Sequence, residues 1–171
     1  MIEQLPGIEF SRRNFLRKSA AGAALAAGPA ILPALGATKK INIAWIGVGT
    51  RGNYLMDMFY EKSADLASVV AVCDAYTGYQ KRAKEKIQSK EGKEPRIYAD
   101  YHELLSRPDI DAVVIATPEH LHYPMAKAAI AAKKHIYCEK PLAHTIEQGA
   151  ELVRNGEASG KVIQVRTQNR S

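Results

Sequence analysis

The chain has 171 residues, with 24 lysines and arginines against 18 aspartates and glutamates and a formal net charge of +6. This length is enough for one ordinary domain with its own hydrophobic core. The densest basic stretch, KRAKEKIQSKEGKE, interleaves its lysines with glutamates and has no aromatic residue, so it indicates the solvated face of a helix and argues against nucleic-acid binding.

The first 37 residues have the order of features found in a secretory leader. Two adjacent arginines, Arg12 and Arg13, precede a Phe-Leu pair and then a run rich in Ala and Gly over residues 20–37. This order predicts a twin-arginine signal peptide over residues 1–37, recognised by the twin-arginine export machinery, with cleavage after Ala37 and a periplasmic or otherwise exported destination. The run is weakly apolar and contains two prolines, so we expect no stable membrane anchor. The alternative is a disordered basic tail with a chance arginine pair.

Residues 38–171 are expected to form one dinucleotide-binding domain, because short apolar runs alternate there with longer amphipathic ones. Helices are indicated from Gly52 onward and over residues 119–132, where apolar side chains recur at helical spacing. Runs rich in Ile and Val with few polar breaks are typical of parallel strands buried on both faces. The alternation predicts an α/β fold, a doubly wound parallel sheet of the Rossmann type with right-handed crossovers. The predicted strands cover residues 41–47, 67–74, 96–99, 111–117, 134–140 and 161–167.

Cys73 and Cys138 each lie at the end of an apolar run, and in the predicted sheet two other strands separate them. Neighbouring strands lie about 4.8 Å apart, and a disulfide needs Cα atoms within about 7 Å. We therefore expect no bridge between them, despite the oxidising destination.

A glycine-rich stretch, GVGTRG, follows the first strand directly and opens the first helix. With Asp74 at the end of the second strand, this is the context that the dinucleotide-binding fingerprint requires. Gly47 permits a tight turn, Gly49 lets the backbone approach a pyrophosphate, and Gly52 lets helix and strand pack closely. The helix N-terminus then attracts the phosphates. A glycine-rich turn that serves packing alone is the alternative. The predicted cofactor-binding residues of this loop are Gly47, Val48, Gly49, Thr50, Arg51 and Gly52.

Asp74 favours NAD over NADP. Its carboxylate can accept hydrogen bonds from free ribose hydroxyls, whereas a 2′-phosphate in the same place would set two negative charges side by side. The residues just after it, AYTGY, contain no arginine that could compensate. NAD is therefore the predicted cofactor, and NADP the less favoured one.

Two further strand ends read ATPEHLHYP and YCEKPLAHT. Together with GVGTRG, VCD, YADYHELLSRPDIDAVVIATP and HLHYPMAKAAIAAKKHIYCEKPLA in this order, they make the chain from about residue 40 to residue 171 similar to the nucleotide-binding domain of the Gfo/Idh/MocA oxidoreductases. The resemblance implies hydride transfer between NAD and a sugar- or polyol-like alcohol.

The resemblance also assigns residues to the site. Thr117 and Pro118 would line the cofactor ribose, and His122 would lie close to the cofactor. Glu139 and Lys140 would lie beside the nicotinamide and bind the cofactor, with Lys140 touching the ribose and, as the catalytic residue, the reacting hydroxyl. A lysine at a strand end can donate to that hydroxyl oxygen and help to relay its proton as hydride leaves the carbon. A packing role for His122 and a surface role for Lys140 are the alternatives.

One position departs from the family's pattern. Glu119 stands where asparagine is frequent, so we do not count it as a binding residue. His120 and His122 are two residues apart near a helix start and face different directions, so no metal site is predicted.

The family's second domain, which holds the substrate and usually a catalytic histidine, has no counterpart among these 171 residues. We therefore expect a complete NAD-binding half that turns nothing over by itself and whose exposed cofactor face favours association, with a homo-oligomer as one form of it. Two other functions stay open, a non-catalytic NAD-binding module and an NAD-dependent glycosidase. Exported glycosidase relatives tend to lose the lysine of the EKP stretch, and its presence here as Lys140 counts against the glycosidase.

Overall fold

A computed structural model describes residues 40–167, and the predicted signal peptide lies outside the described residues. The described chain forms a six-stranded, fully parallel sheet in the order β3-β2-β1-β4-β5-β6. This order confirms the predicted doubly wound Rossmann fold. The strands are β1 (Ile41–Ile46), β2 (Ala67–Cys73), β3 (Arg96–Tyr98), β4 (Ala112–Ile115), β5 (His135–Cys138) and β6 (Ile163–Val165).

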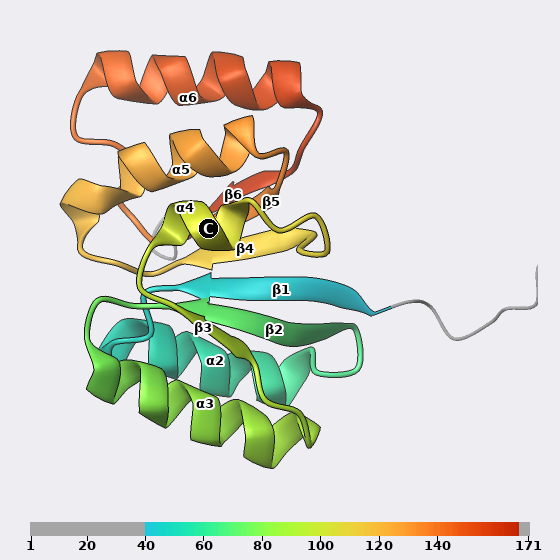
Figure 1. Cartoon of the computed structure of the whole chain (residues 1–171). Coiled ribbons are helices and arrows are strands. Elements are labelled where there is room, and N and C mark those ends of the chain that lie inside the picture. Colours follow the sequence, from blue (N-terminus) through green and yellow to red (C-terminus); the bar gives the residue numbers. More distant parts are fainter. Residues whose placement is uncertain (1–39, 168–171) are drawn as a thin grey trace, which may run out of the picture. The chain divides into compact units, whose positions relative to one another are not determined.

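Helices cover both faces of the sheet (Figure 1). Those that connect the first three strands in sequence, α2 (Thr50–Lys62) and α3 (Thr77–Glu91), lie on one face. The other face carries α4 (Tyr101–Leu105), α5 (His122–Ala131) and α6 (Ile146–Ser159), and a short 3-10 helix, η1 (Glu119–Leu121), precedes α5. None of the described helices combines the length and the apolar character needed to cross a membrane.

Each face of the sheet has its own apolar core. On one face, Trp45 and Val72 pack with Met56 of α2 and with α3. On the other face, Ile46 and Ile115 pack with residues of α4, α5 and α6. Because successive residues of a strand point to opposite faces, both must be apolar when both faces are covered. This explains the unbroken Ile- and Val-rich runs of the sequence.

Two helix boundaries differ from the predicted ones. The first helix begins at Thr50, two residues before Gly52, with Gly49 at the N-cap position and no side-chain cap. The predicted helix over residues 119–132 is divided into η1 and α5. Pro124 lacks a backbone N–H, so it fits only within the first turn of α5 and the turn before it takes the tighter form.

Cys73 and Cys138 are both free and buried. They end β2 and β5, and the sheet order places β1 and β4 between those strands, as predicted. Burial, aided by the charge of Asp74, raises the pKa of Cys73 to about 12. Burial, aided by the charge of Glu139, raises the pKa of Cys138 to about 12 as well.

Candidate functional site

The predicted site residues lie at the carboxyl ends of four neighbouring strands. Gly47 follows β1, Asp74 follows β2, Thr117 lies two residues beyond β4, and Glu139 follows β5. In open parallel sheets, ligands bind outside the carboxyl ends of the strands, where the strand order reverses. In this sheet the order reverses between β1 and β4, so the glycine loop lies at the expected position.

The glycine loop has little room for side chains at two of its three glycines. Gly47 has a positive φ of 86°, and a Cβ atom there would lie 2.8 Å from the backbone of Ala116. A Cβ atom at Gly52 would lie 2.0 Å from the carbonyl oxygen of Gly47. At Gly49, by contrast, the nearest atom would belong to the Tyr79 ring at an ordinary 3.4 Å. Packing within the chain therefore accounts for Gly47 and Gly52 and leaves Gly49 without an internal reason.

The N-terminus of α2 has features that suit a phosphate. No side chain caps the helix, and its first turn contains no acidic residue. The backbone N–H groups of Thr50, Arg51 and Gly52 precede the first helical bond, which runs from the N–H of Asn53 to the carbonyl of Gly49. Uncapped N–H groups and the positive end of the helix dipole favour an anion at this place.

Asp74 is held in place by the loop that it faces. Its Oδ2 accepts a hydrogen bond from the N–H of Val48 at 2.8 Å, and its Oδ1 accepts one from the N–H of Tyr76 at 2.9 Å. A carboxylate has about four acceptor positions, so each oxygen keeps one for another donor. The arrangement is compatible with a ribose diol, and the predicted contact between Asp74 and the cofactor stays a prediction.

An arginine that the sequence analysis overlooked also contacts the glycine loop. Arg82 of α3 donates from Nη2 to the carbonyl oxygen of Val48 at 2.7 Å, and its guanidinium lies 4.8 Å from the centre of the Tyr79 ring. Arg82 lies beyond the AYTGY stretch that follows Asp74. The helical spacing of Tyr79 and Arg82, which puts both on one face of α3, was the signal that could have found it.

A second part of the site is a hollow of about 360 Å³ beyond the ends of β4 and β5. The exposed Lys140 lies in this hollow, beside the buried Glu139. The structure thus brings together five of the predicted residues, while Pro118 caps η1 next to them. The residues lining the hollow are Arg51, Thr117, Glu119, His122, Glu139 and Lys140.

His122 is almost fully buried between two loops. Its Nδ1 lies 2.7 Å from the carbonyl oxygen of Pro141, and its Nε2 lies 2.9 Å from that of Thr117. The ring therefore connects the loop after β4 with the loop after β5. This geometry favours the packing role, and the predicted closeness of His122 to the cofactor stays a prediction.

Glu139 has two arginines as partners. Its Oε1 accepts a hydrogen bond from Nε of Arg51 at 2.6 Å and lies 3.4 Å from Nη1 of Arg166. Arg166 follows β6 and was not among the predicted residues. Nothing in its sequence neighbourhood marks it, because the contact arises only when β6 pairs with β5.

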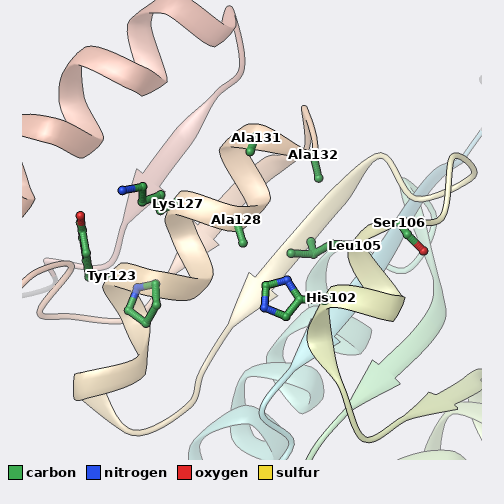
Figure 2. A pocket seen from close by; sticks show the side chains of 9 residues that line it. His102, Leu105, Ser106, Tyr123, Lys127, Ala128, Ala131 and Ala132 are labelled. Carbon is green, nitrogen blue, oxygen red and sulfur yellow. The ribbon is translucent and has the colours of Figure 1, made fainter.

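A larger hollow lies between α4 and α5 (Figure 2), and none of the predicted site residues lines it. Its floor is formed largely by alanines of α5, and the two polar side chains that α5 contributes, Tyr123 and Lys127, both contact Glu151. With these polar groups paired inside the protein, we do not assign a function to this hollow. Within residues 40–167, no group of three or more His, Cys, Asp and Glu side chains is arranged to hold a metal ion.

Comparison with known proteins gives a consistent result. The model of the family GFO_IDH_MocA, described as an oxidoreductase family with an NAD-binding Rossmann fold, matches residues 41–167. A glycosyl hydrolase family 109 protein 2 from Shewanella sp. (strain ANA-3) is 36% identical over 171 residues, which cover 86% of this chain and 37% of that protein. The chain therefore spans little more than a third of the length of this relative.

Two solved structures are similar in both fold and sequence. The WlbA dehydrogenase from Chromobacterium violaceum, in complex with NADH and UDP-GlcNAcA, superposes with a TM-score of 0.68 and 32% identity over 77% of this chain and 36% of that one. An NAD-binding oxidoreductase from Klebsiella pneumoniae superposes with a TM-score of 0.62 and 37% identity over 76% of this chain and 35% of that one.

Proposed function

Because the chain belongs to the Gfo/Idh/MocA oxidoreductase family and contains its NAD-binding Rossmann domain, we propose that it supplies the cofactor-binding part of an enzyme that transfers hydride between NAD and a sugar- or polyol-like alcohol. The WlbA structure, with NADH and a nucleotide sugar bound, supports both the cofactor and the class of substrate. Residues 38–171 are the proposed extent of this domain.

One observation carries the proposal, namely the uncapped N-terminus of α2 beside an oriented carboxylate. The free N–H groups of the first turn suit the pyrophosphate, and Gly49 leaves the approach open. Asp74 suits the ribose hydroxyls, because its two backbone contacts leave acceptor positions free. A packing-only glycine turn would require neither feature.

The nicotinamide end would lie toward the hollow that contains Lys140. NAD supplies the hydride chemistry when it is bound. Lys140 is exposed in this hollow, and we assign it the donation of a hydrogen bond to the reacting hydroxyl and the relay of its proton. Thr117 and Pro118 would contact the adjacent ribose.

Calorimetric titration of the chain with NAD and NADP tests the cofactor part. NAD should bind more tightly, and absence of binding would overturn the proposal. The catalytic part is tested on the native protein by screening sugars and cyclic polyols for NADH formation, which Lys140→Ala should abolish. Formation of NADH at an unchanged rate in that variant would remove Lys140 from the mechanism.

A glycosidase that uses NAD without net redox change is the second candidate. It is favoured by the name of the relative that is 36% identical, a glycosyl hydrolase. Lys140 in the EKP stretch counts against it. The two candidates differ in product, because a dehydrogenase accumulates NADH with a simple alcohol, whereas a glycosidase releases a sugar from a glycoside and leaves the NADH concentration constant.

Export in the folded state is also part of the proposal. A domain that binds NAD is best loaded with its cofactor in the cytoplasm, and the twin-arginine pathway carries folded proteins. Replacing Arg12 and Arg13 together by lysine keeps the charge and removes both guanidinium groups. The precursor should then stay in the cytoplasm, and normal export would refute the twin-arginine signal.

A further inference from the structure

The carboxylate of Glu139 is buried between two guanidinium groups. Glu139 is 5% exposed, and the two arginines, Arg51 and Arg166, both approach its Oε1. A buried carboxylate is costly unless cations and hydrogen bonds compensate it. Two guanidinium groups against one carboxylate leave one net positive charge at this place.

Arg51 is the arginine with donors to spare. Its Nε is used by Glu139, and its guanidinium carbon lies 5.3 Å from the centre of the Tyr54 ring. These two contacts orient the guanidinium. Its two terminal nitrogens make no hydrogen bond with any residue of the described chain, and 41% of the side chain is exposed.

The position of Arg51 gives these free donors a target. It is the second residue of α2, so its side chain starts at the helix N-terminus where the N–H groups are uncapped. It also lines the hollow that contains Lys140. A guanidinium offers two parallel donors that match a phosphate in shape and charge.

Arg166 would keep the charge of Glu139 compensated while Arg51 contacts both Glu139 and a second anion. When the charge of Arg51 is shared with a phosphate, the buried carboxylate loses part of its compensation. Arg166 lies 3.4 Å from the same oxygen, and its backbone N–H is bonded to the carbonyl of Cys138, which anchors it next to Glu139. It supplies the second positive charge.

We propose that Arg51 binds the pyrophosphate of the cofactor through its terminal nitrogens, and that Glu139 and Arg166 are positioning residues that hold Arg51 for this contact. The proposal rests on the proposed function, because it takes NAD as the ligand. It differs from the expected contact between Glu139 and the nicotinamide, and that difference can be measured.

The test compares NAD with ADP-ribose, which has the same pyrophosphate and lacks the nicotinamide. Both are titrated by calorimetry into the 171-residue chain and its variants. Arg51→Lys should lower the affinity for both ligands by the same factor, about tenfold, because lysine keeps the charge and loses the paired donors. Glu139→Gln keeps the size of the side chain and removes its charge. It should lower the affinity for both ligands equally, by about threefold to tenfold. Arg166→Gln should follow the same pattern with a smaller loss.

Non-additivity supplies the second readout. The double variant Arg51→Gln with Glu139→Gln should bind no more weakly than Arg51→Gln alone, because Glu139 acts only through Arg51. Arg154→Gln, which removes an exposed arginine of α6, is the matched control and should bind both ligands as the unaltered chain does. Thermal unfolding of each variant confirms that binding is measured on folded protein. If Glu139→Gln does not fold, the affinities of Arg51→Lys for NAD and ADP-ribose still test the pyrophosphate contact, because Arg51 is half-exposed and its replacement should not prevent folding.

Three results would overturn this proposal alone. The first is a loss of affinity in Glu139→Gln for NAD but not for ADP-ribose, which would place Glu139 against the nicotinamide. The second is full additivity of the two affinity losses in the double variant, and the third is unchanged affinity for both ligands in Arg51→Lys. Failure of the unaltered chain to bind either ligand is a different result, and it would overturn the proposed function itself.

Discussion

The polar groups at the two ends of the parallel sheet differ in how fully they are hydrogen-bonded within the chain. At the amino end, Glu91 accepts hydrogen bonds from Tyr60, Ser68 and the N–H of Val69. At the same end, the buried Lys134 donates to two backbone carbonyls of the segment between α4 and β4. Both of these charged side chains, Glu91 and Lys134, are hydrogen-bonded within the chain.

At the carboxyl end, several groups keep free bonding capacity. The first turn of α2 is uncapped, Asp74 has acceptor positions left, and Lys140 is exposed. The same sheet thus has one end where Glu91 and Lys134 are bonded within the chain and one end where we propose that polar groups bind a ligand. The comparison indicates that free bonding capacity at the strand ends, rather than charge as such, distinguishes the carboxyl end. It predicts that substitutions at the two ends affect different measurements.

The largest expected effect concerns the thiols, which lie just inside the carboxyl end. Burial raises the pKa of Cys73 and of Cys138 from 9.0 to about 12. At a given pH below 9 the thiolate fraction is then about a thousandfold lower than for an ordinary thiol. In the native state at neutral pH, neither cysteine should react with iodoacetamide. Rapid alkylation of the folded protein would show that the thiols are accessible to solvent and would contradict their burial.

The same raised pKa values carry a pH dependence of stability. Because each folded-state pKa lies above its unfolded-state value, this contribution is fully present below about pH 9 and is lost as the pH rises through about 12. Urea unfolding at a series of alkaline pH values should show the decline, and Cys138→Ala should reduce its slope. An unchanged slope would contradict the burial of that thiol.

The next effect concerns the amino end. Glu91→Ala removes three hydrogen bonds to a carboxylate and should destabilise the protein by about 3 kcal/mol, roughly a hundredfold in the folding equilibrium. Below the unfolding temperature, the NAD affinity should stay the same, because Glu91 is at the opposite end of the sheet from the glycine loop. Urea unfolding and calorimetry measure the two quantities. A loss of NAD affinity in folded Glu91→Ala would break the comparison.

Cofactor choice is the third effect and belongs to the carboxyl end. Asp74→Ser combined with Ala75→Arg removes a repulsion and adds a phosphate partner. The ratio of NAD to NADP affinity should fall by at least about tenfold. Equal affinities of the unaltered chain for the two cofactors would refute the role of Asp74.

The smallest effect is expected for Lys140. The side chain is exposed, so Lys140→Ala should change the free energy of unfolding by less than about 0.5 kcal/mol. A matched change at the amino end, Lys134→Ala, should be clearly more destabilising, because it leaves two carbonyl groups without their donor. Equal stability losses in the two variants would remove the distinction between the ends.

The sequence by itself determined the fold class and the strand ends at which the candidate site lies. Strand and helix periodicities are local properties, and their alternation admits few arrangements besides a doubly wound sheet. The glycine loop and Asp74 were identifiable because each stands directly after a strand. Strand ends were predicted one or two residues too long, since Gly47, Asp74 and Lys140 belong to the loops of the site.

Only the tertiary structure decided which side chains contact one another across the site. Arg51 and Glu139 are 88 residues apart in sequence, and Glu139 and Arg166 are 27 apart. Arg82 of α3 donates to the carbonyl of Val48 in the glycine loop, and the ring of His122 joins two loops that follow different strands. Such contacts depend on the order and register of the strands and on side-chain direction, which residue periodicity does not encode. The physical reason is that a pattern along the chain specifies which face a residue lies on, while the partner on that face is set by the strand that the sheet places beside it.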